Sequence, residues 1–375
     1  MASIPFNDLK AHHANHREAF HQALDELLDS SGFIGGKAVA EFEQKFASFC
    51  GSKYCVGVGN GTDAIVIALR GLGIGKGDLV VTVPNTFIAT TEAISESGAE
   101  MLFVDVTENE RTMDLDQLEN LLKTHPERER IKCVIPVHLY GQPVDMPKLK
   151  SIVEPYQIKI LADSAQAHGA FIQDKGIAQY ADVSTFSFYP GKNLGALGDG
   201  GAIVTNDDVL EDYCRRCSNH GRSDKYAHEF EGVNSRLDAL QAKFLTTKLE
   251  VLAEKTRLRQ HFARLYDTQI AERLPELKRP MLIDARLSVF HLYVIQVKDR
   301  DQVIGDLKQQ GIQVGIHYPI AIHQLKAYEH LNLAVGSFPI AEKLSQSILT
   351  LPLYPEMADE DITTVVDALC ECKGI

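Results

Sequence analysis

The chain has 375 residues, of which 45% are hydrophobic and 24% are charged, the usual composition of a soluble globular protein with one large domain or two. Its formal net charge of −13 weighs against nucleic-acid binding, which needs concentrated basic surface, although a cleft in an acidic protein can be locally positive. The first residues lack the pattern of a signal peptide, and no run reaches the roughly 18 apolar residues that span a bilayer, so we expect a cytoplasmic protein with no membrane partner.

Short β-branched runs alternate with amphipathic helical segments through the first two thirds of the chain. Seven runs are predicted as strands: 54–58, 79–83, 101–105, 132–137, 158–162, 183–187 and 202–205. Strands that alternate with helices favour a parallel sheet, because each crossover returns the chain to the same edge. The pattern therefore predicts an α/β fold with a mostly parallel seven-stranded sheet between helices.

The pattern changes beyond about residue 235. Ser235–Arg257 is predicted as one long helix, with leucines at 237, 240, 245, 249 and 252. A strand at Val289–Val297, a helix near Asp301–Gln310, a strand at Gln313–Ile316 and two closing helices are expected to follow. We predict a large domain at 1–245 and a small C-terminal α+β domain at 246–375.

Three glycine-rich segments invite comparison with nucleotide-binding loops, but none has a complete motif. The third glycine of G-x-G-x-x-G would fall at Thr62, and the Gly–Lys pairs at 75–76 and 191–192 lack the remaining P-loop residues. Gly59–Asp63 still joins a predicted strand to a helix, where backbone N–H groups and the helix dipole suit one phosphate dianion. Such turns are common in α/β proteins, so this loop alone leaves both interpretations open.

A second loop, which follows the predicted strand at 183–187, places a lysine in an unusual setting. Five glycines in the eleven residues 191–201 surround Lys192. Burial lowers the pKa of an amine and makes it a nucleophile near neutral pH. Ser187, five residues upstream, offers a hydroxyl for a phosphate. A lone lysine is most often a solvated surface charge, but this context favours a chemical role.

Asp163 directly follows a predicted buried strand, at the edge where open α/β sheets bind ligands. A carboxylate in that position is costly unless it is paired, and a protonated pyridine nitrogen would be a suitable partner. An aspartate after a strand is also a common helix cap. Together with Lys192 and the phosphate loop, the ligand-binding interpretation is favoured.

These motifs resemble those of the fold-type I pyridoxal-phosphate (PLP) enzymes of the DegT-like nucleotide-sugar aminotransferase family. The resemblance extends from Ser31-Gly-Phe-Ile-Gly-Gly36 and Val39–Glu43 to His317-Tyr-Pro319, with the motifs in the family's order. It implies a fold-type I aminotransferase with pyridoxal 5′-phosphate as cofactor. The position before Asp163, often acidic in the family, is Ala162, which we interpret as a harmless departure.

The resemblance also implies individual roles. Lys192 matches the catalytic lysine that forms a Schiff base with the cofactor, and Asp163 matches the carboxylate that faces its ring nitrogen. The other implied cofactor contacts are Gly61, Thr62 and Ser187 at the phosphate, Phe87 over the ring, Gln166 at the ring hydroxyl, and Asn234 at the phosphate of the neighbouring subunit. Implied substrate contacts are Tyr189, Lys225, His317 and Tyr318. Asn234 therefore implies a homodimer with shared active sites.

The reaction that the resemblance implies is transfer of an amino group from L-glutamate to a keto sugar carried by a nucleotide, a step in deoxyamino-sugar and glycan or lipopolysaccharide biosynthesis. The loop from Ser187 to Gly200 resembles the branch that aminates carbon 3 of a dTDP-linked 3-keto-6-deoxyhexose. The branch that acts at carbon 4 more often has a His after Ser-Phe and a Glu-Gly-Gly after the lysine. A UDP-linked 3-keto uronic acid is the alternative substrate, because a similar loop serves it.

Three other classes remain open. A PLP-dependent sugar dehydratase typically replaces the lysine with histidine, whereas this chain keeps Lys192. A non-enzymatic regulator of the same fold would be expected to lose Lys192 or Asp163, or to gain a basic DNA-binding extension. An amino-acid aminotransferase would need an arginine for the distal carboxylate of its substrate, and the sequence does not single one out.

The cysteines and histidines give little support for a metal site, and we predict none. Cys214-Arg-Arg-Cys217 has metal or redox spacing, but no second pair with zinc spacing accompanies it, so two structural thiols are favoured. The seven cysteines are expected to be reduced. His12, His13 and His16 could bind a metal through the i and i+4 positions of a helix, or could form a solvated helix face.

Overall fold

The computed structural model describes residues 3–281, 283 and 286–375. Its main sheet has seven strands in the order β1-β9-β8-β5-β4-β2-β3. These strands are β1 Tyr54–Val58, β2 Leu79–Thr82, β3 Glu100–Phe103, β4 Ile131–Val134, β5 Lys159–Asp163, β8 Val183–Ser187 and β9 Gly201–Thr205. β9 pairs antiparallel with β1 and β8, and the other pairs in the sheet are parallel. The predicted mostly parallel sheet is confirmed.

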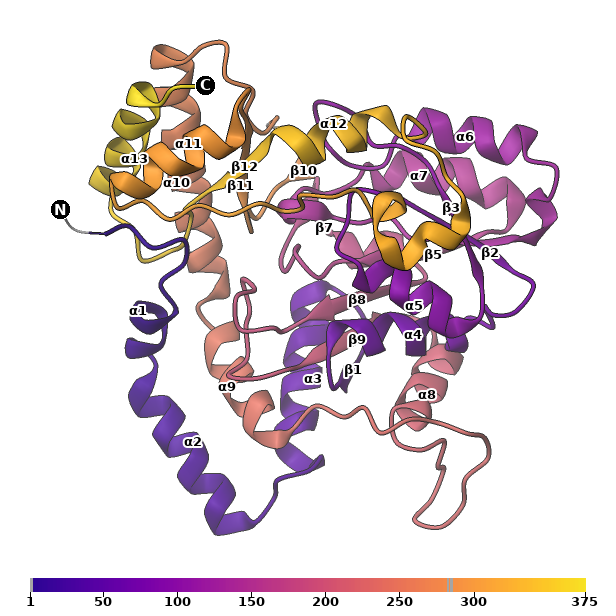
Figure 1. Ribbon diagram of the computed structural model, residues 1–375. Coiled ribbons are helices and arrows are strands. Elements are labelled where there is room, and N and C mark those ends of the chain that lie inside the picture. The colour runs from indigo at the N-terminus through magenta and orange to yellow at the C-terminus, as the bar shows by residue number, and fades with distance from the viewer. Residues whose placement is uncertain (1–2, 282, 284–285) are drawn as a thin grey trace.

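Helices cover both faces of this sheet (Figure 1). One face packs against α4 Gly61–Gly71, α5 Ala89–Ser97 and α8 Asp208–Cys217. The other packs against α3 Gly36–Cys50, α6 Leu115–Thr124, α7 Met146–Val153 and α9 Ala239–Leu249. Neighbouring residues of a strand point to opposite faces, so Val80 and Val81 of β2 enter different core clusters. Because both faces are buried, most of the strands are largely apolar, which is why they could be located from the sequence.

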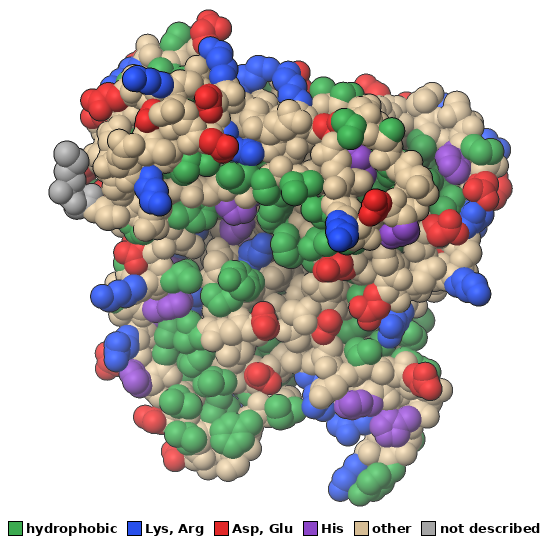
Figure 2. Space-filling model, in the orientation of Figure 1, with side chains coloured by type: hydrophobic (Ala, Val, Ile, Leu, Met, Phe, Trp, Pro, Cys, Tyr) green, Lys and Arg blue, Asp and Glu red, His purple; other side chains and the backbone are tan. Residues whose placement is uncertain are grey.

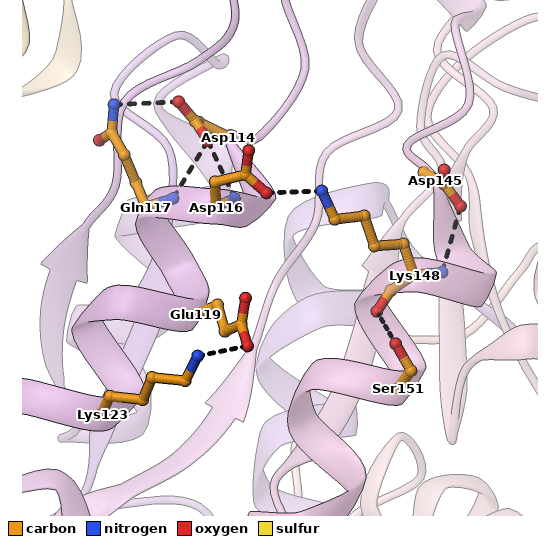
Figure 3. Close-up of polar contacts among 8 residues, drawn as sticks. All are labelled: Asp114, Asp116, Gln117, Glu119, Lys123, Asp145, Lys148 and Ser151. Carbon is orange, nitrogen blue, oxygen red and sulfur yellow. Dashed lines mark hydrogen bonds and ion pairs between the residues drawn. The ribbon is translucent and has the colours of Figure 1, made fainter.

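The neighbouring helices α6 and α7 have capped starts and are joined by an ion pair (Figure 3). Asp114 accepts hydrogen bonds from the backbone N–H groups of Asp116 and Gln117 at the start of α6. Asp145 accepts one from the N–H of Lys148 at the start of α7. The Lys148 ammonium lies 2.6 Å from the Asp116 carboxylate. Caps of this kind are worth about 1 kcal/mol each, whereas the exposed ion pair contributes less.

A smaller α+β layer lies at one end of the molecule (Figure 1). Its elements are α10 Leu252–Arg273, β11 Tyr293–Gln296, α11 Arg300–Gln309, α12 Pro339–Ser347, β12 Ile348–Leu351 and α13 Asp359–Glu371, with β11 and β12 antiparallel. The start of the chain belongs to this layer, because Ile4 enters its core and forms a parallel bridge with Ile312. The other α-helices and strands are α1 Leu9–Ala14, α2 Arg17–Ser30 and the short strands β6 Phe171–Ile172, β7 Lys175–Gly176 and β10 Arg286–Leu287, and short 3-10 turns join several of the elements.

Three predicted elements differ in the structure. The long helix expected at Ser235–Arg257 is two helices, α9 and α10, because α9 packs against α3 while α10 packs against α13. The strand expected at Gln313–Ile316 is an extended segment with isolated bridges, since its neighbours, near Ile4 and Thr350, meet it at single points. The strand expected at Val289–Val297 is confined to β11. We propose that the domain boundary lies close to the α9–α10 junction; the position predicted from the sequence, between 245 and 246, falls within α9.

The cysteine and histidine motifs have structural surroundings. Cys214 and Cys217 are free thiols on the buried side of α8, as the sequence favoured. His12 lies in α1 with its Nδ1 2.9 Å from the Glu356 carboxylate. Within residues 3–281, 283 and 286–375, no group of three or more His, Cys, Asp or Glu side chains is arranged to hold a metal. No helix in the same part of the chain is long and apolar enough to cross a bilayer.

Candidate active site

A cavity of about 910 Å³ lies at the carboxyl ends of the parallel strands, where the main sheet meets the small layer. This is the edge at which open α/β sheets bind ligands. Ten of the predicted site residues line it: Gly61, Thr62, Phe87, Asp163, Gln166, Ser187, Tyr189, Lys192, His317 and Tyr318. The fold therefore brings residues as far apart in the sequence as Gly61 and Tyr318 to the lining of one cavity.

The start of α4 forms one corner of the cavity. Asn60 caps this helix, its side-chain oxygen accepting a hydrogen bond from the Asp63 N–H at 2.8 Å. The first N–H groups of a helix have no acceptor within the helix, so this end attracts anions. A Cβ atom on Gly61 would lie 2.7 Å from the Cβ of Ser187. Glycine is therefore required for the helix start and Ser187 to approach each other, which brings the Ser187 hydroxyl close to the first N–H groups of the helix.

Asp163, the last residue of β5, is a buried carboxylate without an ionic partner among the described residues. Its Oδ2 accepts a hydrogen bond from the Thr90 hydroxyl at 2.8 Å, and its Oδ1 accepts one from the Ala165 N–H at 3.2 Å. Thr86 in turn bonds to the Thr90 hydroxyl at 2.9 Å. Burial raises the pKa of Asp163, and these hydrogen bonds oppose that effect. The carboxylate is thus held in one orientation and suits a cationic ring nitrogen.

Lys192 enters the same cavity from the loop between β8 and β9. Burial lowers the pKa of its ammonium to about 8, although the Asp163 carboxylate acts in the opposite direction. The loop is fixed by its neighbours: Asn193 donates to the Val289 carbonyl at 3.1 Å, and the buried Lys248 donates to the Gly195 carbonyl. A substantial fraction of Lys192 is therefore a neutral, positioned amine near physiological pH, which is the reactive form of a lysine nucleophile.

Gln166 connects the floor of the cavity to the segment that covers it. Its side-chain oxygen accepts a hydrogen bond from the Tyr140 N–H at 2.6 Å, and its nitrogen donates to the Tyr318 hydroxyl at 3.3 Å. The Tyr140 hydroxyl donates to the carbonyl of His317. Phe87 lies opposite, with its ring centroid 5.5 Å from that of Tyr318. Residues 317 and 318 are thereby held over the large domain.

Two predicted site residues, Lys225 and Asn234, lie outside this cavity. Both belong to the segment between α8 and α9, part of which projects from the body of the chain (Figure 1). The Lys225 ammonium lies 5.3 Å from the ring centroid of Tyr226, which is 84% exposed. Asn234 was predicted to act on the neighbouring subunit, so its position outside the cavity of its own chain does not contradict that role. Lys225 makes no contact with the cavity of its own chain.

The cavity also contains residues that the sequence did not single out. His138 accepts a hydrogen bond from the Val144 N–H at 3.0 Å through Nδ1, and its Nε2 has no partner within the described part of the chain. Its position just after β4, at the ligand-binding edge of the sheet, was the signal that could have identified it. Thr90 lies four residues after Thr86 and three after the predicted site residue Phe87. Arg259 lies on α10, inside an ordinary helical pattern that carries no such signal.

Comparison with protein families decides the relationship. The profile of the DegT/DnrJ/EryC1/StrS aminotransferase family matches residues 14–370. The chain belongs to this family. A relative in Aneurinibacillus thermoaerophilus, a dTDP-3-amino-3,6-dideoxy-alpha-D-galactopyranose transaminase, is 41% identical over 98% of both chains. A second, the UDP-2-acetamido-2-deoxy-3-oxo-D-glucuronate aminotransferase of Pseudomonas aeruginosa, is 35% identical over 98% of this chain and 99% of its own.

Solved structures of family members agree with the fold. DesV of S. venezuelae superposes with a TM-score of 0.95 at 37% identity, covering 99% of this chain and 98% of its own. NtdA of Bacillus subtilis, with the aminated cofactor PMP bound, has a TM-score of 0.88 at 31% identity, covering 95% of this chain and 82% of its own. The predicted fold-type I architecture is confirmed. The chain is a nucleotide-sugar aminotransferase of the family, and its cofactor is pyridoxal 5′-phosphate.

Proposed function

We propose that this aminotransferase moves an amino group from L-glutamate to carbon 3 of a dTDP-linked 3-keto-6-deoxyhexose, making a dTDP-3-amino-3,6-dideoxyhexose. The observation that carries the proposal is the pairing of Lys192, an amine with a lowered pKa, and Asp163, a buried carboxylate, in one cavity. The relative with 41% identity, which is named for a dTDP-3-amino sugar, supports this choice of substrate. The loop from Ser187 to Gly200 supports amination at carbon 3.

The residues present fit the cofactor. The corner made by Gly61, Thr62 and Ser187 would hold its phosphate, and Asp163 would pair with its ring nitrogen. The Phe87 ring would cover its face, and Gln166 would contact its ring hydroxyl. PLP, when bound, supplies an electron-accepting ring that stabilises negative charge on a substrate carbon. Since Asp163 has no ionic partner of its own in the described chain, a cationic nitrogen would remove the cost of burying that carboxylate.

Lys192 would carry out the proton transfers. It lines the same cavity as Tyr189, and its neutral amine can accept a proton from a substrate carbon and return it to another carbon. The hydrogen bonds from Thr90 and Ala165 favour the ionised form of the Asp163 carboxyl, against the effect of its burial. A lysine with a pKa of about 8 exchanges protons efficiently near neutral pH, because both of its forms are populated.

The sugar would be held from the other side of the cavity. Tyr189, His317 and Tyr318 line the cavity and offer hydrogen bonds to sugar hydroxyls. Burial lowers the pKa of His317 to about 4, so its ring is neutral and can both donate and accept. We propose that these contacts bring carbon 3 into reach of the cofactor nitrogen, and that Lys225 contacts the diphosphate of a nucleotide bound at a subunit boundary.

We further propose that the active unit is a homodimer in which Asn234 reaches the phosphate of the neighbouring site. Hydrophobic side chains gather over the end of α2 and the segment after it (Figure 2), where Leu28, Phe33 and Ile34 are exposed. Exposed apolar patches of this kind mark interaction surfaces. Mixing inactive Lys192→Ala and Asn234→Ala proteins should restore part of the activity, because one site of the hybrid has both native residues. A monomer that is active at assay concentration in sedimentation experiments would rule out the shared site.

A UDP-linked 3-keto uronic acid is the second candidate substrate, and the Pseudomonas aeruginosa relative favours it. The deciding experiment is NMR of the product formed from the dTDP-3-keto sugar and L-glutamate. We expect nitrogen at carbon 3. Nitrogen at carbon 4, or no turnover while the UDP-linked compound is consumed, would overturn the substrate assignment. The dehydratase alternative is disfavoured because the chain keeps Lys192 in the cavity, and an NMR product that has lost a hydroxyl without gaining nitrogen would revive it.

A further inference from the structure

The cavity contains a buried arginine that has no role in binding the cofactor or the sugar. Arg259, on α10, is 5% exposed and lines the same cavity as Lys192. Among the described residues, no carboxylate lies within ion-pair distance of its guanidinium. Burial lowers the pKa of Arg259 to about 10, and only the more distant Glu356 opposes this effect. A buried cation without an anion is costly, so its presence calls for an explanation.

The hydrogen bonds of Arg259 leave part of the guanidinium available. Three backbone carbonyls accept from it: that of Leu353 at 2.7 Å, that of Phe290 at 3.3 Å and that of His291 at 3.4 Å. All three bonds come from the same terminal nitrogen. A guanidinium has five N–H donors in a fixed fork, so the second terminal nitrogen and Nε remain for another acceptor.

The charges around the cavity make Arg259 the suitable group for a further anion. Among the residues that the structure describes, the lysine and arginine side chains that line the cavity are Lys192 and Arg259. Lys192 is committed to the cofactor. The histidines are neutral, since burial lowers the pKa of His138 to about 3 and that of His317 to about 4. Burial likewise lowers the pKa of His291.

We propose that Arg259 binds a carboxylate of the amino donor, a dicarboxylic amino acid. This inference rests on the proposed function, because it names the group that recognises the donor at the same site. The free edge of a guanidinium matches the two oxygens of a carboxylate. The group is almost completely buried, which suits a small planar anion better than the diphosphate of a nucleotide. The donor must enter the cavity without the nucleotide contacts that would hold the sugar substrate, so it needs a charged anchor of its own.

The test uses glutarate, a dicarboxylate without an amino group, as a probe of the PLP-loaded enzyme. Its dissociation constant is measured by calorimetry and by the change in the cofactor absorption band. Loss of a hydrogen-bonded charge pair should weaken glutarate binding about 10- to 100-fold in Arg259→Gln. Arg257→Gln is the matched control, because Arg257 is exposed on the same helix and the charge change is identical. Arg259→Lys keeps the charge but loses the fork, and should lie between the two.

A structural role alone would give a different result, because Arg259 also supports three carbonyls. The affinity for dTDP and the thermal midpoint of each variant are therefore measured in parallel. Selective loss of glutarate binding with dTDP binding retained supports the inference. Glutarate binding within twofold of wild type, or an equal loss of glutarate and dTDP binding in both Arg259 variants, overturns it. The proposed function is judged separately, by product formation with the wild-type enzyme, so the two can fail independently.

Discussion

Replacement of Thr90 by valine isolates the contribution of one hydrogen bond to cofactor binding. The Thr90 hydroxyl donates to the Asp163 carboxylate at 2.8 Å and so stabilises its ionised form. A hydrogen bond to a charged group is worth about 1.5–3 kcal/mol. The second donor, the Ala165 N–H at 3.2 Å, remains in the variant. We therefore take the lower end of that range, which corresponds to an affinity for PLP about tenfold weaker at neutral pH.

The pH dependence of this effect has a definite sign. Without Thr90 the pKa of Asp163 rises further above its ordinary value, so the carboxyl of the apoenzyme is neutral over a wider range. Binding of a cationic ring nitrogen requires the ionised form. The loss of affinity should therefore be largest at acidic pH and shrink as the pH rises.

Fluorescence titration of apoenzyme with PLP between pH 6 and pH 9 measures both quantities. Thr91→Val is the matched control, because Thr91 is the next residue, is equally buried, and donates to the Ile88 carbonyl instead of to a carboxylate. If the two variants bind PLP equally across this pH range, Asp163 does not act through its ionised form and the reasoning is wrong.

Three further changes test the cavity. Gly61→Ala should weaken PLP binding and lower the free energy of unfolding by about 1–3 kcal/mol, because the new methyl group would meet Ser187. Gly305→Ala is the control: it has open space around it and should leave PLP binding unchanged. PLP titration and thermal unfolding compare the two variants. The rate at which PLP reconstitutes the apoenzyme should rise about tenfold per pH unit below pH 8 and level off above it, because only the neutral amine of Lys192 reacts and its pKa is about 8. A rate that does not change with pH in stopped-flow absorbance would contradict this. Asp163→Asn should raise the melting temperature of the apoenzyme at pH 8 but not at pH 4. A carboxyl whose pKa is raised in the folded state destabilises the fold only when the pH lies above its pKa in the unfolded state, near 3.8. The affinity of the same variant for PLP should fall.

The sheet and the central residues of the cavity could be predicted because short stretches of sequence are enough to identify them. Most of the strands are buried, largely apolar runs. Asp163 is the last residue of β5 at the ligand-binding edge, and Lys192 lies in the loop that follows β8. The resemblance to a family then connected these positions with His317 and Tyr318, which are far away in the chain. No local pattern could have made that connection.

The failures share one physical origin, which is that tertiary partners override local pattern. The α9–α10 junction contains neither proline nor glycine, so nothing in the sequence signals that the two halves pack against different helices. Arg259 occupies a normal helical position, and only the fold reveals that three carbonyls and a cavity surround it. Lys225 lies in the segment between α8 and α9, outside the cavity of its own chain, and its contact with the substrate stays a prediction.

The position of the first residues has a practical consequence for protein engineering. Ile4 is anchored to the small layer, and the ring of Phe6 stacks on that of His317 at 5.6 Å, with Phe6 and Asn7 lining the cavity. A truncation at this end would therefore remove residues that line the cavity, and an affinity tag would lie close to them. Purification handles belong instead after α13. Libraries designed to change the accepted sugar should include Phe6 and Asn7 alongside the residues of the lysine loop.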